Sequence, residues 1–459
     1  MGKKAYFKQV FNTFFLFNFL KPIHMKKRLQ LLMCALLLIG SIKAQELSID
    51  ADIRPRAEYL RGFGNLVPSG VDAAIFVQQR SRLKFGYTAD KFSTYLSVQD
   101  VSVWGDTPQI AAADNNSSFS LAQAWINFKF GSGWSTKIGR QALSYDDQRI
   151  LGGLDWAMQG RFHDAALIKY KNESGLKLDF GFSFNQNGVS RINTLFDPNN
   201  DGNVRAVFDY KGMAYAWLHK DWAKFSGSFL FVNNSYQNLD TDGQTPIDGT
   251  VNRQTFGTHL VAKPAKGLKI ALNLYAQTGK FTETVDLSAY NAGLEVTYKP
   301  GKTLFGIGGE LLSGDDNGGT DGEITSFFPI FGTNHKFNGY MDYFYVGNHA
   351  NSVGLQDIYA KAVIKTGKSS SLLAKLHYFS AAEDIAGTDD TYLGTELDLV
   401  FTQKILPYAT LKIGYSQMFA GDSMEILKGV ADPSGLQNWG WAMLVVKPNF
   451  LKWSPKPKQ

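Results

Sequence analysis

Alternation of apolar and charged side chains begins just after residue 45 and constrains the fold more than any other feature. Between residues 47 and 59, every second position is apolar. Neighbouring side chains of an extended strand point to opposite faces, so this period of two predicts a strand with one apolar face. The intervening positions carry mostly charged side chains, which form the other face: Ser48, Asp50, Asp52, Arg54, Arg56 and Glu58.

The alternating runs are too long for ordinary soluble strands. They extend over about 10 to 15 residues, whereas strands of soluble proteins have about 5 or 6. A soluble β-sandwich is the alternative for strands with one apolar face, but the length matches tilted strands that cross a bilayer. We expect about 18 such strands, at residues 46–61, 73–89, 91–105, 118–130, 134–146, 163–172, 176–187, 209–220, 223–236, 252–263, 267–280, 287–299, 303–314, 354–366, 369–382, 390–404, 408–420 and 437–447.

Short and long connections alternate between these strands. Tight turns occupy residues 131–133, 172–175, 221–222, 264–267, 300–302 and 367–368. Longer polar loops lie at residues 188–208, 237–251 and 315–353. Short periplasmic turns and long extracellular loops are typical of outer-membrane barrels. The sequence therefore predicts an all-β fold: a single transmembrane antiparallel up-and-down β-barrel over residues 45–459, with both ends in the periplasm.

A basic and apolar leader precedes the barrel. Lys26, Lys27 and Arg28 are followed by an apolar run at residues 29–42 and then by Ala44. The run is shorter than the roughly 20 residues of a spanning helix, and its flanks are those of a signal peptide. We therefore interpret residues 1–44 as a signal peptide, with Met25 as the expected true start, and expect the mature protein in the bacterial outer membrane, in contact with its lipid and lipopolysaccharide.

The overall composition agrees with a membrane barrel and excludes some functions. Aromatic residues make up 14% of the chain and glycines number 45, which suits barrels with aromatic girdles. The net charge of +6 is too small over this length to indicate nucleic-acid binding. The single cysteine, Cys34, lies in the leader, so we expect neither a disulfide nor a cysteine-based metal site.

Charged residues on the inward strand faces are the candidate pore residues. A barrel of this width encloses a water-filled lumen whose lining sets selectivity. The inward basic residues are Arg54, Arg56, Arg80, Arg82 and Lys84, joined later in the chain by Lys129, Lys361, Lys365 and Lys375. Arginine suits carboxylate and phosphate groups, so the pore would favour anions. An internal salt-bridge network is the open alternative, because inward acidic residues are also present: Asp50, Asp52, Glu58, Glu295, Glu310, Glu396 and Asp398.

Two further stretches are distinctive. The first begins Gly139-Arg140-Gln141 and continues through Arg149 to Gly160-Arg161-Phe162. The second lies in the longest predicted outer loop, where residues 328–342 read FPIFGTNHKFNGYMD. Together with the barrel pattern, these stretches resemble the alginate-export family of outer-membrane barrels. The resemblance implies a porin-like barrel of about 18 strands with an electropositive pore for an anionic uronate polymer.

The resemblance also implies functional residues. Arg140, Arg149, Asp155 and Arg161 match the first motif, and His163 departs from it. The residues that match the second motif would form an inward loop constriction: His335, Lys336, Tyr340 and Asp342. We expect an anionic oligo- or polysaccharide, or another small anion, as the solute, and a periplasmic partner is a further candidate.

Weaker signals concern metals and catalysis. Asp197, Asn199 and Asp201 have the spacing that opens a calcium-binding loop. Phe208 stands where that loop needs a bidentate glutamate, so calcium is a weak candidate and a plain polar loop is the alternative. No histidine after residue 44 lies in a recognisable nucleophile or zinc motif. We therefore expect no enzyme and name no catalytic residue; the alternatives to a channel are a structural or adhesive barrel with a plugged lumen and an outer-membrane hydrolase.

Overall fold

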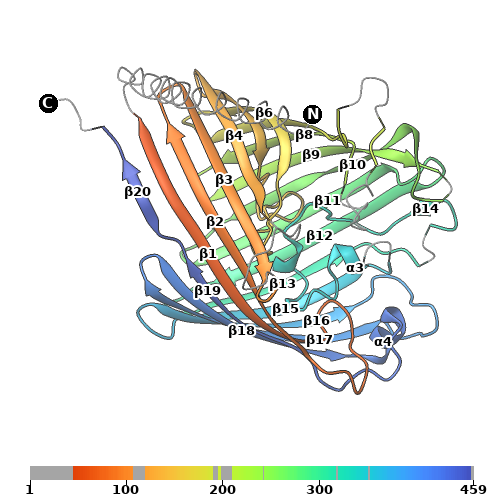
Figure 1. Cartoon of the computed structure of the whole chain (residues 1–459). Coiled ribbons are helices and arrows are strands. Elements are labelled where there is room, and N and C mark those ends of the chain that lie inside the picture. Colours follow the sequence, from red (N-terminus) through yellow and green to blue (C-terminus); the bar gives the residue numbers. More distant parts are fainter. Residues whose placement is uncertain are drawn as a thin grey trace, which may run out of the picture.

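The structure, a computed structural model, is a closed antiparallel barrel of 18 strands, which confirms the predicted fold (Figure 1). It describes residues 45–106, 119–189, 195–197, 209–240, 242–316, 319–349 and 352–455. The predicted leader at residues 1–44 lies outside these ranges. The short turns gather at one end of the barrel, and the long loops and helix α4 lie at the other (Figure 1).

The wall consists of strands β1 to β13 and β15 to β19. Their bounds are β1 Glu46–Arg61, β2 Ala74–Thr88, β3 Phe92–Val103, β4 Ser120–Gly131, β5 Trp134–Gln141, β6 His163–Lys171, β7 Leu176–Phe184, β8 Gly212–Asp221, β9 Phe225–Leu239, β10 Pro246–Ala262, β11 Leu268–Lys280, β12 Asp286–Tyr298, β13 Leu304–Leu312, β15 Leu355–Ile364, β16 Ser370–Ser380, β17 Tyr392–Leu406, β18 Ala409–Ala420 and β19 Gln437–Val446. Two short strands are added, β14 Glu323–Ile324 and β20 Asn449–Trp453.

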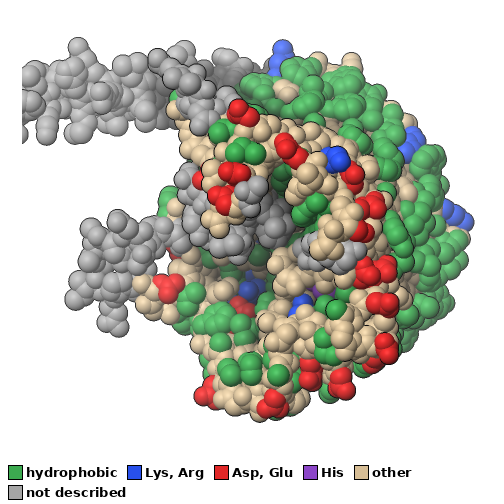
Figure 2. Space-filling model, turned by 90° about the vertical axis from the view of Figure 1, so that its right-hand side faces the viewer, with side chains coloured by type: hydrophobic (Ala, Val, Ile, Leu, Met, Phe, Trp, Pro, Cys, Tyr) green, Lys and Arg blue, Asp and Glu red, His purple; other side chains and the backbone are tan. Residues whose placement is uncertain are grey.

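The outer surface of the wall is apolar because the alternating residues point outward there. Ile75, Ile307 and Ile358 are each more than 60% exposed, an arrangement that a soluble protein rarely tolerates over a large area. Hydrophobic side chains cover the outer wall at the right of Figure 2. Lipid satisfies this surface, and the closed hydrogen-bonded wall leaves no strand edge unpaired in the bilayer.

The barrel closes where the first strand meets the last. β1 pairs with β2 along one side and with β19 along the other, with Ile53 opposite Val446 and Leu60 opposite Trp439. The chain then bends at Pro448, which has no N–H to donate but accepts a hydrogen bond from the Ala51 N–H at 3.0 Å. β20 continues the pairing with the first residues of β1, a strand that the sequence analysis did not predict.

Three expected element boundaries are wrong. The strand expected at 134–146 ends at Gln141, because the chain turns into the lumen and buries Leu143. The loop expected at 237–251 is mostly strand, since β9 and β10 pair almost to their outer ends. β14, within the expected loop 315–353, pairs in parallel with the start of β12 and is not a wall strand.

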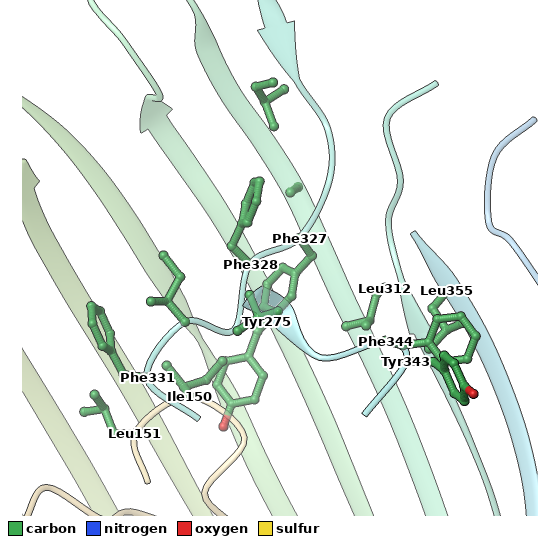
Figure 3. Close-up of a cluster of buried hydrophobic side chains, with 14 of the residues drawn as sticks. Ile150, Leu151, Tyr275, Leu312, Phe327, Phe328, Phe331, Tyr343, Phe344 and Leu355 are labelled. Atoms are coloured by element: carbon green, nitrogen blue, oxygen red, sulfur yellow. The ribbon is translucent and has the colours of Figure 1, made fainter. Parts of the chain in front are cut away.

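Apolar residues also fill part of the lumen. Phe328 and Phe331, from the chain after β14, and Ile150 and Leu151, from the chain after β5, lie inside the barrel against wall residues such as Tyr275 (Figure 3). All of these side chains are at most 6% exposed. The outer half of the lumen therefore contains a packed core rather than water alone.

The helices are short and lie in the loops. They are the 3₁₀-helix η2 Asn334–Lys336 and the α-helices α3 Val346–His349 and α4 Asp422–Lys428. Gly429 ends α4 in the left-handed conformation with φ +65°, which suits glycine. Within the described residues, no helix is long and apolar enough to cross a membrane.

We expect Gly414→Ala to destabilise the barrel, because its Cβ would lie 2.1 Å from the inward indole of Trp441. Overpacking of this kind costs about 1–3 kcal/mol of unfolding free energy. Gly440 on the neighbouring strand has nothing within 4 Å of an added Cβ, so Gly440→Ala is the matched control. Urea unfolding of the barrel refolded into lipid vesicles, followed by tryptophan fluorescence, measures both changes. Equal effects of the two substitutions would contradict the packing argument.

Candidate functional site

Two segments of the chain fold into the lumen and contact each other there. The first inward segment, residues 142–162, connects β5 to β6, and the second inward segment, residues 325–349, precedes β15. The Gly152 N–H donates to the Phe331 carbonyl at 2.8 Å, and the Thr333 N–H donates to the Gln148 carbonyl at 2.9 Å. Arg161, predicted to be a pore residue, donates to the Gly332 carbonyl at 2.8 Å and so ties the segments together.

The inward arginines of β1 and β2 hold the first inward segment against the wall. Asp155 lies 3.0 Å from Arg80 Nη2, 3.2 Å from Arg54 Nη2 and 3.6 Å from Arg82 Nη1. The guanidinium groups also donate to backbone carbonyls of this segment: Arg54 to Asp155 at 2.7 Å and Arg82 to Gln159 at 2.7 Å. The arginines therefore bind both the Asp155 carboxylate and the backbone of this segment, and these several contacts fix its position against the wall.

Wall carboxylates bind the same cations. Asp52 lies 2.9 Å from Arg80, 3.4 Å from Arg54 and 3.5 Å from the Lys84 ammonium. Arg80 is fully buried and Asp52 is 1% exposed. The internal salt-bridge network that the sequence left open is therefore present in the structure. The role of these arginines in anion selectivity stays a prediction.

Arg56 binds the first inward segment in a different way. Its guanidinium donates to Glu58 at 2.8 Å and lies 4.8 Å from the ring centroid of Trp156. Trp156 stacks on His335 with ring centroids 4.6 Å apart, and Trp441 meets Trp156 edge to face at 4.8 Å. A cation held over a tryptophan face is favourable, so Arg56 stabilises the junction between the wall and both inward segments.

The predicted loop constriction does lie in the lumen, on the second inward segment. His335 Nδ1 lies 2.9 Å from Asp342, and Tyr340 stacks on the His335 ring at 5.4 Å. Lys336 donates to the Asp147 carbonyl of the first inward segment at 2.7 Å. His335 therefore contacts both Tyr340 and Asp342, whereas Lys336 binds the first inward segment, and a constriction formed by these four residues stays a prediction.

Arg149 is buried between the two inward segments and the wall, so the expectation that it lines the pore is wrong. It is 1% exposed, and its Nε lies 2.7 Å from Glu310 on β13. It also donates to the side-chain oxygen of Asn338 at 2.9 Å. A buried charge without a partner would strongly destabilise the fold, and Glu310 provides that partner.

Glu396 and Asp398 point inward as predicted but do not reach the open lumen. Both are fully buried beneath the second inward segment, where the Met341 N–H donates to Glu396 at 2.9 Å. His377, between them and β15, lies 2.7 Å from Asp357. The second inward segment covers this group of ionisable residues, and their expected role as pore-lining residues is therefore wrong.

Arg140 is on the outer face, which corrects its assignment to the pore. Its strand neighbour Ile138 is 47% exposed to the outside, and Arg140 pairs with the outward Asp164 at 2.9 Å. The alternation places Gln141 inward instead. Lys129 keeps its predicted inward parity and lies exposed near the periplasmic end of β4.

The open part of the lumen lies on the side away from the arginines. A cavity of about 420 Å³ is bounded by β10 to β16 and by the second inward segment. Figure 2, seen from the side of the long loops, shows a central hollow in which Lys or Arg and His side chains are visible. The charged and aromatic residues that line the cavity are Lys269, Lys336, Lys361, Lys375, Asp147, His259, Glu295, Glu310, Asp357, Phe337, Tyr340 and Tyr359.

Within the described residues, the carboxylates of this cavity are all engaged. Glu310 binds Arg149, Asp357 binds His377, and Glu295 binds Lys361 and the Tyr359 hydroxyl. Asp147 accepts a hydrogen bond from the Asn273 amide at 2.7 Å.

Three lysines that line the cavity have no such pairing. In the part of the chain that the structure describes, Lys269, Lys336 and Lys375 form no ion pair with a carboxylate. Lys269 was missed by the sequence analysis, although its alternation with Leu268 and Ile270 places it inward. Because Arg149 neutralises Glu310 and Lys361 neutralises Glu295, these three lysines share the lining with two remaining carboxylates, Asp147 and Asp357.

A serine–histidine contact on β8 and β9 also escaped the sequence analysis. His219 lies 2.9 Å from Ser228 Oγ and, through its other ring nitrogen, 2.9 Å from Asp221. Ser228 donates its hydroxyl proton to Asp146 of the first inward segment. A serine nucleophile must instead pass that proton to histidine, and Ser228 is 4% exposed. The contact therefore ties this wall to the segment.

The predicted calcium ligands Asn199 and Asp201 lie outside the described residues. Asp197 is described, at the edge of a hollow near Asp164 and Asp209. Across the described ranges, no group of three or more His, Cys, Asp or Glu side chains has the geometry to hold a metal ion. Calcium at this loop therefore stays a prediction.

The anchoring carboxylate should stay charged at all ordinary pH values. Burial raises the pKa of Asp155, but the positive charges of Arg54 and Arg80 outweigh burial and lower that pKa to about 2. The unfolded value is about 3.9. The stabilisation by Asp155 is therefore fully present above pH of about 4 and is lost as pH falls towards 2.

We expect Asp155→Asn to loosen the first inward segment without unfolding the barrel. Three guanidinium groups would lose their shared carboxylate, although solvent screening limits the effect because the Asp155 side chain is 63% exposed. Amide hydrogen exchange in residues 142–162 should become about fivefold faster. Asp286→Asn, which removes the exposed pair with Lys280, is the control and should leave these amides unchanged. Unchanged exchange in Asp155→Asn would show that the backbone contacts suffice.

Comparisons with known proteins agree with this architecture. The barrel is similar to Pseudomonas aeruginosa OccK9 (OpdG), with a TM-score of 0.59, 12% identity and coverage of 88% of this chain and 98% of that one. Acinetobacter baumannii OccAB4 has a TM-score of 0.57 and 13% identity, with coverage of 89% of this chain and 99% of that one. P. aeruginosa OpdK, solved with vanillate, has a TM-score of 0.55 and 10% identity, with coverage of 88% of this chain and 99% of that one. These likenesses show the fold.

The sequence itself gives the family. A comparison with curated proteins found no match. Residues 45–433, which include the barrel strands up to β18 and both inward segments, match the family described as alginate export. The protein is therefore a member of the alginate export family, and its porin-like barrel lies in the bacterial outer membrane.

Proposed function

We propose that this barrel conducts anions, with anionic oligo- or polysaccharides and small organic carboxylates as its solutes. The single observation that supports the proposal most is the cavity with three lysines, Lys269, Lys336 and Lys375, that form no carboxylate ion pair within the described residues. Three such lysines exceed the two remaining lining carboxylates, Asp147 and Asp357, and an excess of positive charge in a lumen attracts anions and repels cations. OpdK was solved with vanillate, a carboxylate anion, which is why small carboxylates are included.

Aromatic rings beside the lysines suit sugar acids. Tyr340, Tyr359 and Phe337 line the same cavity, and the Lys375 ammonium lies 4.0 Å from the Tyr359 ring centroid. Binding sites for organic molecules combine apolar rings with a few placed polar groups. The C–H face of a sugar ring can pack on an aromatic ring while its carboxylate meets an ammonium group.

The arginines of β1 and β2 have a different part in the proposal. Arg54, Arg80 and Arg82 hold the first inward segment on one side of the lumen, so the proposed path runs along the other side, from β10 to β16. In this interpretation the arginines narrow the pore and position its lining. They contribute to anion preference through their field, since they outnumber the carboxylates Asp52 and Asp155 that bind them.

A structural or adhesive barrel with a plugged lumen is the second candidate. The observation in its favour is that the two inward segments bind each other and the wall through buried groups such as Arg149. Single-channel recording in planar bilayers separates the candidates. A channel gives steps of conductance with a reversal potential that favours chloride over potassium, whereas a plugged barrel gives no steps. Clear cation preference would contradict the proposal.

We expect Lys269→Gln combined with Lys336→Gln to shift the reversal potential towards cations. Removing two of the unpaired cavity charges should lower the anion-to-cation permeability ratio by about twofold or more. The matched control is Lys91→Gln with Lys266→Gln, which removes the same charge from two exposed periplasmic turns. If the control shifts the potential as much as the cavity variant, the cavity lysines do not determine selectivity.

A further inference from the structure

A second hollow lies at the periplasmic mouth, below the cavity. Its volume is about 530 Å³, within the range typical of ligand pockets. It shares Leu304 and Val363 with the lining of the interior cavity, so the two spaces adjoin. Val363, Thr402 and Thr410 line it from strand positions of inward parity, which places the hollow on the lumen side of the wall and not on the lipid side.

Five lysines from three successive turns surround this hollow: Lys299, Lys302, Lys365, Lys368 and Lys404. All five are exposed. Neither its lining nor the turns at 299–303, 365–369 and 404–408 contain an Asp or Glu. Hydroxyl groups of Ser369, Ser371 and Thr402 also line it and can donate hydrogen bonds.

Such a cluster concentrates positive charge around one hollow, and no carboxylate in the lining compensates it. Anions are therefore attracted to this mouth of the barrel. Because the charges are spread over three turns, a chain that carries several carboxylates in sequence fits them better than one small ion does.

Charge at the other end of the same strands has the opposite sign. The loop between β16 and β17, at residues 381–391, carries Glu383, Asp384, Asp389 and Asp390 and no lysine or arginine. Acidic side chains are prominent on the loop face in Figure 2. The field along the lumen therefore concentrates anions at the periplasmic mouth and not at the extracellular rim.

We infer that the lysine-lined hollow at the periplasmic mouth is a loading site that captures a polyanionic chain, of the polyuronate class, from the periplasm and directs it into the lumen. This inference rests on the proposed function, because it names the point of entry and the solute class of the same pore. The lysines provide attraction at long range, and the hydroxyl groups hold the first carboxylates at short range.

The test uses the full-length protein inserted with known orientation into planar bilayers of zwitterionic lipid, with a short oligouronate as the probe. Oligouronate added to the periplasmic side should block the current with a faster on-rate than oligouronate added to the extracellular side. In the variant Lys302→Gln/Lys368→Gln/Lys404→Gln, the periplasmic on-rate should fall by about tenfold, because steering is lost. The extracellular on-rate should stay nearly the same.

A matched control has the same change of charge at the same end of the barrel. Lys91→Gln/Lys171→Gln/Lys224→Gln removes three exposed lysines from turns that do not line the hollow. It should retain most of the periplasmic on-rate. An equal loss in both variants would overturn the inference, because general surface charge would then explain capture. A difference that arises only when anionic phospholipid is added would also overturn it, and would assign the lysines to lipid headgroups.

A binding measurement separates failure of this inference from failure of the proposed function. Isothermal titration of the oligouronate into the refolded protein should show binding that the hollow variant weakens and the control variant retains. Loss of binding only in the hollow variant supports the loading site even if no current is seen. Current with anion preference, together with binding that is equal in all variants, would overturn the loading site and leave the channel intact.

Discussion

Closure of the wall is the constraint on which the rest of this structure depends. In a bilayer every backbone N–H and C=O of a strand needs a partner, and only a closed sheet provides one for each strand. β1 meets both β2 and β19, and β20 extends the closure past Pro448. Closure fixes strand parity, and parity decides that the apolar positions face lipid while Arg54, Arg80 and Lys361 face the lumen.

Inward charges in the lumen need either protein partners or water. In this barrel they have protein partners on the side of β1 and β2, and an open cavity on the opposite side. Over β1 and β2, Asp155 brings a carboxylate and several carbonyl groups to the arginines, and the first inward segment is fixed there. Along β10 to β16 the wall combines charged side chains such as Glu295 and Lys361 with small ones such as Gly293, and an open cavity remains. The arginines thus narrow the pore by binding a segment of the chain itself.

The sequence predicts the wall far better than the lumen. Strand alternation is a local signal, so β1 and β11 were placed to within a residue at each end. The contacts that bury the inward arginines are not encoded locally, because they join residues far apart in the sequence. Arg54 and Asp155 are 101 residues apart, and Arg149 and Asn338 are 189 residues apart. Strand alternation alone predicted that Glu396 and Asp398 line the pore, but the second inward segment covers and buries them. For Arg140 the family resemblance outweighed parity, which places it outside.

Inward position is therefore not enough to make a charge part of a selectivity filter; the charge must also lack a partner. Arg80 points inward, but Asp52 and Asp155 lie at hydrogen-bond distance from its guanidinium group and partly cancel its electric field. Lys269 lines the cavity and forms no ion pair within the described residues. At the periplasmic mouth, five exposed lysines likewise have no carboxylate in the lining of their hollow. An anion approaching from the periplasm would meet these lysines first, and of the five, strand parity predicted only Lys365 to point inward.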